Sequence, residues 1–187
     1  PDTQALLDLC LREDIGSGDV TTDAIFSPDV RATAVIGARE PTIACALPLA
    51  EHIFRRLDPD AQISDSLQEG AEVAAGQPIM RVESNLRALL TAERTVLNFL
   101  MRLSGIAYAA RLAQSAVPEG CKAKIYDTRK TTPGWRRLEK AAVATGGAYN
   151  HRFGLFDAVL IKDNHVAEVG SVGEAVRLCR AKVGNDM

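Results

Sequence analysis

The chain has 187 residues, of which 47% are apolar, so a packed core is expected and wholesale disorder is not. The formal net charge of -2 argues against a general nucleic-acid binder, which would be basic overall. No apolar run approaches the roughly 18 residues of a membrane helix, and no basic-then-apolar start suggests an uncleaved signal peptide. The four cysteines are far apart and form no CxxC pair, which predicts neither a zinc site nor a disulfide framework and favours a reducing cytoplasm.

The first 84 residues predict short helices and strands separated by turns. An apolar face of Leu49, Ile53 and Leu57 indicates one amphipathic helix, and Gly16 and Gly18 end an earlier one. Alternating apolar and polar residues between glycines indicate strands joined by tight turns. The predicted helices are 3–12 and 47–57, and the predicted strands are 31–37, 42–47 and two within 69–84.

A long helix is predicted over residues 84–117, and one arginine on it is out of place. Leucines and a methionine at steps of three and four form an apolar stripe, which consists of Leu86, Leu90, Leu97 and Met101. Arg94 falls on this stripe. Because a buried unpaired charge costs several kcal/mol, Arg94 is expected to meet an anionic partner or an opening to solvent. Structural pairing with Glu93, or with an acid elsewhere in the fold, is the alternative.

After Pro118 the pattern alternates between strand and helix, as in an α/β barrel or a parallel sheet. The predicted elements are strand 123–127, helix 134–145, strand 157–162 and helix 171–184. Ser171 and Glu174 form the capping-box pattern at the start of the last helix. Ligand-binding residues of such folds lie at the carboxyl ends of strands, where Asp127 to Lys130 and Lys162 to His165 are expected.

Positive charge is concentrated around these strand ends. Between Arg94 and His165, twelve lysines and arginines stand against five acids. Arginine presents a planar fork that suits a carboxylate, and lysine a compact charge that suits a phosphate. The clusters at 128–130, 150–152 and 162–165 therefore predict a small ligand with several negative groups. Solvated helix faces are the favoured interpretation for five other cations, which are Arg102, Arg111, Arg136, Arg137 and Lys140.

Other site types are not indicated by the motifs. His151 and His165 lack any metal-ligand spacing, so no metal site is expected from them. The sequence contains no G-x-S-x-G elbow, no GxxxxGK[ST] loop and no GxGxxG. A binding module without turnover, and a purely structural domain whose basic residues are merely solvated, remain alternatives to an enzyme.

Three segments resemble the quinolinate phosphoribosyltransferase family, also called nicotinate-nucleotide pyrophosphorylases (carboxylating). They read EDIGSGDVTT, TAERTVLNFLMRLSGIA and DTRKTTPGWRRLEKAAVATGGAYNHRFGLFDAVLIKDNH, and the resemblance runs from about residue 11 to about residue 183. A related family linked to molybdenum transport shares the fold and some motifs. A non-catalytic or transport-linked homologue that binds a small anion is therefore the alternative function.

The resemblance implies a reaction and its partners. Quinolinate and phosphoribosyl pyrophosphate would give nicotinate mononucleotide, pyrophosphate and carbon dioxide, with Mg²⁺ as cofactor, in de novo NAD biosynthesis. The enzyme would be a cytoplasmic homodimer that binds neither nucleic acid nor membrane. Its chemistry needs a cationic pocket that orients two carboxylates and stabilises moving charge, more than acid–base groups.

The resemblance also implies roles for individual residues. Lys130 would face phosphoribosyl pyrophosphate, and Lys130 and Lys162 would be catalytic. Arg94 would reach the active site of the other subunit across the dimer interface. No metal ligand is expected in this chain. The residues that would bind quinolinate are Arg94, Thr128, Arg129, His151, Arg152 and Lys162.

The fold class implied by the resemblance is α/β: an α+β N-terminal domain followed by an open, incomplete α/β barrel. We expect residues 1–104 to form the N-terminal domain with a long linking helix, which caps the partner's active site. Residues 105–187 would form the first part of the barrel. Members of the family continue beyond this chain with acidic residues for ribose and metal and a loop for phosphate. This chain by itself is therefore expected to be inactive or weakly folded.

Overall fold

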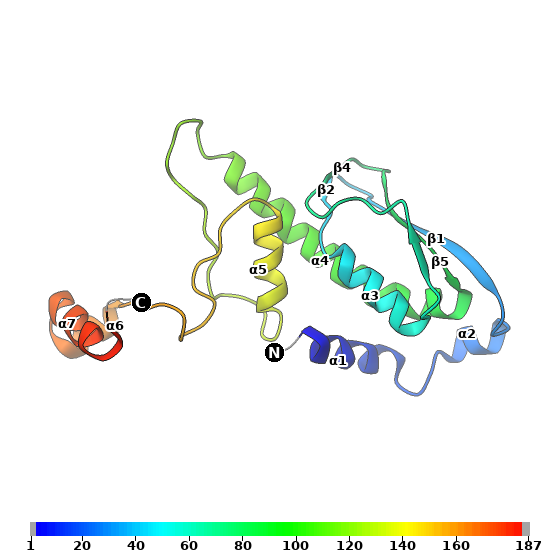
Figure 1. Cartoon of the computed structure of the whole chain (residues 1–187), viewed down its shortest axis with the longest axis horizontal. Helices are drawn as coiled ribbons and strands as arrows, with labels where there is room; N and C mark the ends of the chain where they lie inside the picture. The colour runs from blue at the N-terminus through cyan, green and yellow to red at the C-terminus, as the bar shows by residue number, and fades with distance from the viewer. Residues whose placement is uncertain (1–2, 185–187) are drawn as a thin grey trace.

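The computed structural model describes residues 3–184, and its centre is a helix of 30 residues, α4 (Leu86–Ser115). The side chain of Asn85 caps this helix by accepting a hydrogen bond from the backbone N–H of Arg87 at 2.9 Å. Around α4 lie α1 (Thr3–Ile15), α2 (Val20–Ile25), α3 (Leu47–Leu57) and a sheet (Figure 1). The mixture of helices and strands confirms the α/β class.

The sheet has the order β1-β5-β3 and is antiparallel throughout. It is formed by β1 (Arg31–Gly37), β3 (Gln62–Ser64) and β5 (Pro78–Asn85), while β2 (Thr42–Ile43) and β4 (Glu72–Val73) form a separate small pair. Met80, Val82 and Ser84 of β5 are fully buried, whereas Arg81 and Glu83 between them are exposed. The strands predicted within 69–84 exist, but they pair with other strands and not with each other.

The strand predicted at 42–47 ends at Ile43, so its second half was predicted wrongly. Ala46 adopts a left-handed backbone with φ of 69°, which breaks the extended chain. The carboxylate of Glu69 accepts hydrogen bonds from the backbone N–H groups of Ala46 (2.5 Å) and Leu47 (3.0 Å). A distant acid therefore starts α3 at the point where the apolar run favoured a strand.

The buried face of α4 is not the predicted stripe. Leu90 and Met101 are 37% and 58% exposed, and Arg94 is exposed beside them. The helix instead buries a second row of side chains against α3 and the strands, which includes Leu89, Val96, Phe99, Leu103 and Ala107. Both rows have helical spacing, so tertiary packing decided which one entered the core. On α3, likewise, Ile53 is buried as predicted, but Leu49 and Leu57 are only partly buried.

The second half contains α5 (Arg136–Thr145), α6 (Asp163–Val169) and α7 (Val172–Val183). The ring of Trp135, just before α5, stacks on Phe99 of α4 with centroids 4.6 Å apart. Gly146 ends α5 against the backbone of Ala107, where a side chain would collide. As predicted, Ser171 caps α7 by accepting a hydrogen bond from the N–H of Glu174 at 3.1 Å, and Gly184 ends it.

The predicted strands at 123–127 and 157–162 do not form within residues 3–184. The first contributes a single parallel bridge, between Tyr126 and Tyr149, and the second has no ladder partner. A strand requires a neighbour that pairs with its N–H and C=O groups, and apolar composition alone does not supply one. Lys162 consequently lies at the N-terminus of α6, and α6 and α7 lie together at one end of the molecule (Figure 1).

Candidate anion-binding site

Two loops from different parts of the second half lie side by side. We call them loop A (residues 126–132) and loop B (residues 149–157). The N–H of Asp127 donates to the carbonyl of Tyr149 at 3.0 Å, and the N–H of Tyr149 donates to the carbonyl of Ile125 at 2.9 Å. This pairing brings the predicted clusters at 128–130 and 150–152 together, although neither follows a regular strand.

A buried ion pair joins the loops to α5. Lys140 Nζ lies 2.5 Å from Asp127 Oδ1, and the two side chains are only 4% and 8% exposed. The same lysine donates to the carbonyl of His151 at 2.9 Å, and the N–H of His151 donates to Asp127 Oδ1 at 2.8 Å. With its amide nitrogen turned toward Asp127, Asn150 adds a hydrogen bond of 2.7 Å to the second carboxylate oxygen. The interpretation of Lys140 as a solvated cation was therefore wrong.

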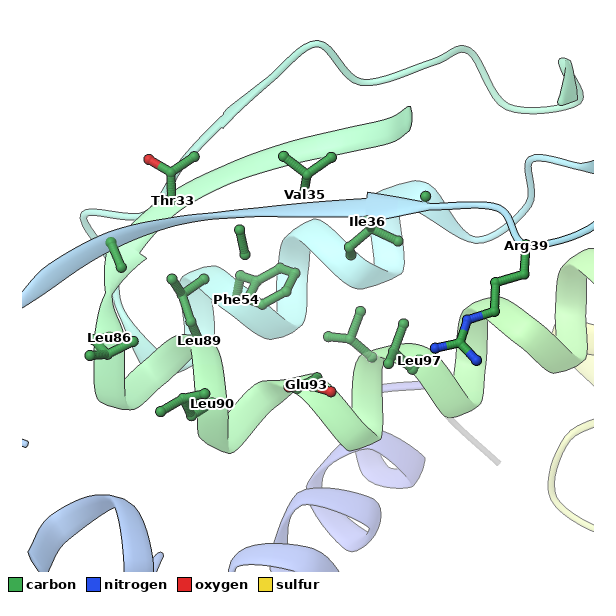
Figure 2. A pocket seen from close by; sticks show the side chains of 14 residues that line it. Thr33, Val35, Ile36, Arg39, Phe54, Leu86, Leu89, Leu90, Glu93 and Leu97 are labelled. Carbon is green, nitrogen blue, oxygen red and sulfur yellow. The ribbon is translucent and has the colours of Figure 1, made fainter. Parts of the chain in front are cut away.

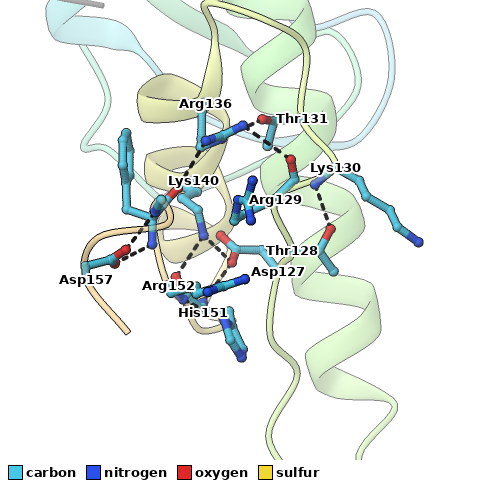
Figure 3. A network of polar contacts seen from close by, with 12 residues as sticks. Asp127, Thr128, Arg129, Lys130, Thr131, Arg136, Lys140, His151, Arg152 and Asp157 are labelled. Carbon is cyan, nitrogen blue, oxygen red and sulfur yellow. Dashed lines mark hydrogen bonds and ion pairs between the residues drawn. The ribbon is translucent and has the colours of Figure 1, made fainter. Parts of the chain in front are cut away.

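Arg136 makes a second connection between the loops (Figure 3). Its guanidinium donates to Thr131 Oγ1 at 3.0 Å and to the carbonyl of Arg129 at 3.5 Å, both in loop A. It also donates to the carbonyl of Phe153 in loop B at 3.2 Å. Arg136 was predicted to be solvated. It is instead the first residue of α5 and donates hydrogen bonds to both loops.

Arg102 and Arg111 were also predicted to be solvated, but both bind other groups of the protein. Arg102 forms an ion pair of 2.5 Å with Glu139, and Arg111 donates to the carbonyl of Gly146 at 2.9 Å. Burial by itself raises the pKa of Glu139, but hydrogen bonds from Arg102 and Thr132 outweigh it, and the pKa is lowered. Arg137 is exposed, as predicted.

The two arginines predicted to bind carboxylates have unused donors. Arg129 Nε and Arg152 Nε are both buried, and neither has a hydrogen-bond partner. Arg152 uses one other nitrogen, Nη1, to donate to the carbonyl of Ala158 at 2.9 Å. Because buried polar groups are normally satisfied, two orphaned guanidinium donors on adjacent loops indicate a site for an anionic ligand.

The remaining loop residues face outward. Thr128 Oγ1 accepts a hydrogen bond from the N–H of Lys130 at 3.0 Å, and Figure 3 shows the Lys130 side chain extended away from Arg129 and Arg152. Thr128 and Lys130 line a small hollow of about 150 Å³. The His151 side chain is exposed, and its Nδ1 accepts a hydrogen bond from the N–H of Arg152 at 2.7 Å.

Asp157 shapes loop B, and the sequence interpretation did not assign it a role. Its carboxylate accepts hydrogen bonds from the N–H groups of Gly154 (2.7 Å) and Phe153 (2.5 Å), and these bonds lower its pKa. The predicted strand began at Asp157, so a turn held by the side chain of this aspartate was not expected. The available signal was the residue type: an aspartate three residues after Gly154 can hold a turn through its side chain.

Two predicted site residues lie elsewhere. Lys162 forms no ion pair among residues 3–184, and its N–H donates to His165 Nδ1 at the start of α6 (2.9 Å). Arg94 lines a hollow of about 270 Å³ with Asp14 and Asp19, and its guanidinium makes no hydrogen bond or ion pair within the described residues. The alternative of structural pairing with Glu93 is therefore wrong. The structure gathers Thr128 to Lys130 with His151 and Arg152 on loops A and B. Arg152 also lines a hollow of about 400 Å³ with Ile161 and His165, which flank Lys162, whereas Arg94 lies on α4.

A larger hollow lies away from loops A and B. It has a volume of about 450 Å³ and lies between β1 and α4, with Phe54, Leu89 and Leu97 among its walls (Figure 2). Arg39 is its only cation and Glu93 its only acid. An apolar hollow with opposed single charges does not fit a dicarboxylate, so loops A and B remain the candidate site.

The described residues contain neither a cluster of metal-ligating side chains nor a membrane-spanning helix. Among residues 3–184, no three His, Cys, Asp or Glu side chains gather as a metal site. The described helices include none with the length and apolarity needed to cross a membrane. The four cysteines, Cys10, Cys45, Cys121 and Cys179, are free thiols.

Comparisons with known families match nearly the whole chain. The model described as the N-terminal domain of quinolinate phosphoribosyl transferase matches residues 19–104, and the C-terminal domain of the same family matches residues 106–187. A nicotinate-nucleotide pyrophosphorylase (carboxylating) of Mycobacterium leprae is 44% identical and covers 91% of this chain. A mitochondrial quinolinate phosphoribosyltransferase (decarboxylating) of Nicotiana tabacum is 42% identical over 94% of this chain.

Solved structures agree with these matches. The structure of NadC from Streptococcus pyogenes superposes with a TM-score of 0.92 at 39% identity and covers 95% of this chain. A nicotinate-nucleotide pyrophosphorylase from Ehrlichia chaffeensis gives a TM-score of 0.92 at 34% identity over 99% of this chain. The chain spans 50% of the tobacco relative, 61% of the mycobacterial one, and 63% and 67% of the two structures.

Proposed function

This chain belongs to the quinolinate phosphoribosyltransferase family, and we propose that the full-length protein transfers a phosphoribosyl group to quinolinate. The pyridine nitrogen attacks the anomeric carbon of phosphoribosyl pyrophosphate as pyrophosphate leaves. The resulting pyridinium accepts the electron pair of the bond to the 2-carboxylate, which departs as carbon dioxide, and a proton replaces it. The products are nicotinate mononucleotide, pyrophosphate and carbon dioxide.

The observation that carries this proposal is the pair of orphaned donors on Arg129 and Arg152. Quinolinate has two adjacent carboxylates, and two guanidinium groups on neighbouring loops would each take one through charge-assisted hydrogen bonds. Thr128 and His151 are beside them, and we assign them to the same substrate. Lys130, which extends the other way, is assigned to phosphoribosyl pyrophosphate.

We further propose that Lys162 and Arg94 contribute to this site in the assembled protein. We assign Lys162 a catalytic, carboxylate-facing role and place Arg94 in the site of a second subunit of a homodimer. The unpaired guanidinium of Arg94 and the exposed Leu90 and Met101 beside it support an interface on this face of α4. Mg²⁺ is proposed as the cofactor of the complete reaction, and no cluster of three His, Cys, Asp or Glu side chains is present among residues 3–184 to hold it by itself. A cytoplasmic location is proposed from the free thiols.

The first test is calorimetric titration of the full-length protein with quinolinate and with nicotinate, which lacks the second carboxylate. We expect saturable binding with a preference for quinolinate. Arg152→Ala should lose about 1.5–3 kcal/mol of quinolinate binding free energy, the range for a charge-assisted hydrogen bond. Arg137→Ala, an exposed cation on the neighbouring helix, is the matched control and should leave binding unchanged. Equal affinity for both acids would contradict the proposal.

Turnover separates the enzyme from a homologue that only binds a small anion. The full-length protein should release carbon dioxide and pyrophosphate in equal amounts when both substrates are present. Binding of quinolinate without release of either product would instead support a non-catalytic or transport-linked homologue.

The shared role of Arg94 can be tested by mixing two inactive variants. If Arg94 acts in the partner's site, subunits with Arg94→Ala and subunits with Arg152→Ala should regain activity when they exchange. Each mixed dimer then contains one site with both arginines. If Arg94 acts within its own subunit, every site in the mixture lacks one arginine, and activity stays absent.

A further inference from the structure

The cations of α5 that face the two loops have no ligand-binding role in the proposal above. Arg136 and Lys140 are four residues apart, so they lie on one face of the helix. Lys140 is 4% exposed, and its Nζ has two acceptors in the protein. Both acceptors belong to the protein, so the charge of Lys140 is already paired, although its side chain borders the small hollow that Thr128 and Lys130 line. Its burial calls for another explanation.

Each of these cations contacts both loops. Lys140 contacts the carboxylate of Asp127 in loop A and the carbonyl of His151 in loop B. Arg136 contacts the carbonyl of Arg129 in loop A and the carbonyl of Phe153 in loop B. The contacts fall next to the candidate carboxylate-binding residues: Asp127 lies two positions before Arg129, and His151 directly precedes Arg152.

Stability alone is a poor reason to bury such a pair. Desolvation of two charges offsets much of their attraction, and well-packed apolar side chains of similar volume often stabilise a fold as well or better. Geometric specificity is what an ion pair with several directed hydrogen bonds adds. Here the carboxylate of Asp127 also accepts the N–H of His151 at 2.8 Å, so one ion pair fixes loop B at two backbone groups.

We propose that Lys140, through Asp127 and His151, is a positioning residue that sets the separation of Arg129 and Arg152 and so makes the site selective for two adjacent carboxylates. Arg136 supports the same separation one helical turn away. This inference rests on the proposed function, because it concerns how the same site distinguishes a dicarboxylate from a monocarboxylate. A ligand with one carboxylate needs one guanidinium, whereas a ligand with two needs both at a fixed spacing.

The variant that tests this proposal is Lys140→Met, which keeps an unbranched side chain and removes the charge. The measured quantity is the ratio of quinolinate affinity to nicotinate affinity in the folded full-length protein. We expect the ratio to fall by about tenfold or more, the scale on which supporting hydrogen bonds affect binding sites. Arg137→Met removes a charge from the exposed side of the same helix and should leave the ratio unchanged.

A second variant guards against misfolding, because Lys140→Met alone leaves the Asp127 carboxylate buried without its cation. Asp127→Asn combined with Lys140→Met leaves no unpaired charge and keeps an acceptor for the N–H of His151. The positioning contact between Asp127 and Lys140 is still lost, so this double variant should also lose selectivity. Circular dichroism would establish that each protein is folded.

The outcomes separate this inference from the proposed function. If the wild-type protein does not prefer quinolinate, the proposed function fails, and the positioning role fails with it. If the wild type prefers quinolinate and a folded variant keeps the same ratio while both affinities are unchanged or fall together, only the positioning role is overturned. If neither variant folds, the ion pair is required for folding, and its assignment to selectivity is wrong.

Discussion

Buried apolar side chains are concentrated in residues 3–116, whereas residues 117–184 contribute only Ala142, Ala148 and Ala175 to the described core. The first region contains Ile53, Phe99 and other large side chains with almost no exposure. The second region is connected instead by polar contacts, among them the ion pair of Asp127 and Lys140. Burial of apolar side chains therefore characterises the first region, and directed hydrogen bonds characterise the candidate site in the second.

This difference bears on function. Apolar contacts tolerate small changes of geometry, because they are not directional. Hydrogen bonds and ion pairs fix the distance between particular atoms, which is what two guanidinium groups need in order to bind two carboxylates. The candidate site is accordingly in the region with fewer buried apolar side chains, next to α5, which contacts both loops.

The largest loss of stability is expected from a substitution that creates a cavity in the first region. Phe99→Ala removes a ring that is 1% exposed and that stacks on Trp135, so it should lower the free energy of unfolding by about 3–5 kcal/mol. Urea denaturation followed by circular dichroism measures this change. Met101→Ala, on the exposed side of the same helix, should change stability by less than about 0.5 kcal/mol. Similar losses in both variants would contradict the packing described for α4.

A smaller effect is expected where the two regions meet. In Gly146→Ala the new methyl group would collide with the carbonyl of Ala107 and the side chain of Ala110, which forces α5 away from α4. We expect a loss of about 1–3 kcal/mol, as for other overpacked sites. Gly105→Ala places a methyl group in open space within the same α4 and should stabilise the helix by up to about 1 kcal/mol. Urea denaturation should show a lower unfolding free energy for Gly146→Ala and a higher one for Gly105→Ala, which would confirm the close contact between α5 and α4.

A pH-dependent effect is expected in the first region. Hydrogen bonds from Ser84 and from the N–H of Asn85 lower the pKa of Asp58. The stabilisation is therefore present above the unfolded-state pKa of about 3.9 and is lost as the pH falls through the lower folded-state pKa. Asp58→Asn, which does not titrate, should flatten the fall in unfolding free energy between about pH 4 and pH 2.

Asp60→Asn is the control for this series, since its side chain takes no part in those hydrogen bonds. It should retain the wild-type dependence on pH. An unaltered slope in Asp58→Asn would show that other acids cause the loss of stability at low pH.

The smallest effect on stability is expected from substitution of a cysteine. The reactivity of the thiols, however, should differ between the two regions. Burial, with the nearby charge of Glu69, raises the pKa of Cys45 to about 12, so this thiol should resist a disulfide reagent at pH 8. Cys121 in the second region is exposed and should react quickly. Cys121→Ser should remove the fast phase and change stability by less than about 0.5 kcal/mol. Rapid labelling of Cys45 in the folded protein would contradict its burial.

Much of the local structure was predictable from short-range patterns. The helix at 47–57 and the strand at 31–37 have the predicted bounds, because their apolar spacing and flanking breakers agree. Errors arose where a distant group decided the outcome. Glu69 starts α3 from 22 residues away, and the buried row of α4 was chosen by its neighbours in space.

The sequence by itself determined which chemical groups the candidate site contains: the type and clustering of Thr128, Arg129, Lys130, His151 and Arg152 predict an anion-binding site. Only the tertiary structure decided that loops A and B lie together, that Arg129 and Arg152 keep buried donors without partners, and that Lys140 is enclosed. The physical reason is that composition specifies charge and hydrogen-bonding capacity. The burial and pairing of a charge depend instead on segments that are distant in the chain, and no local pattern records them.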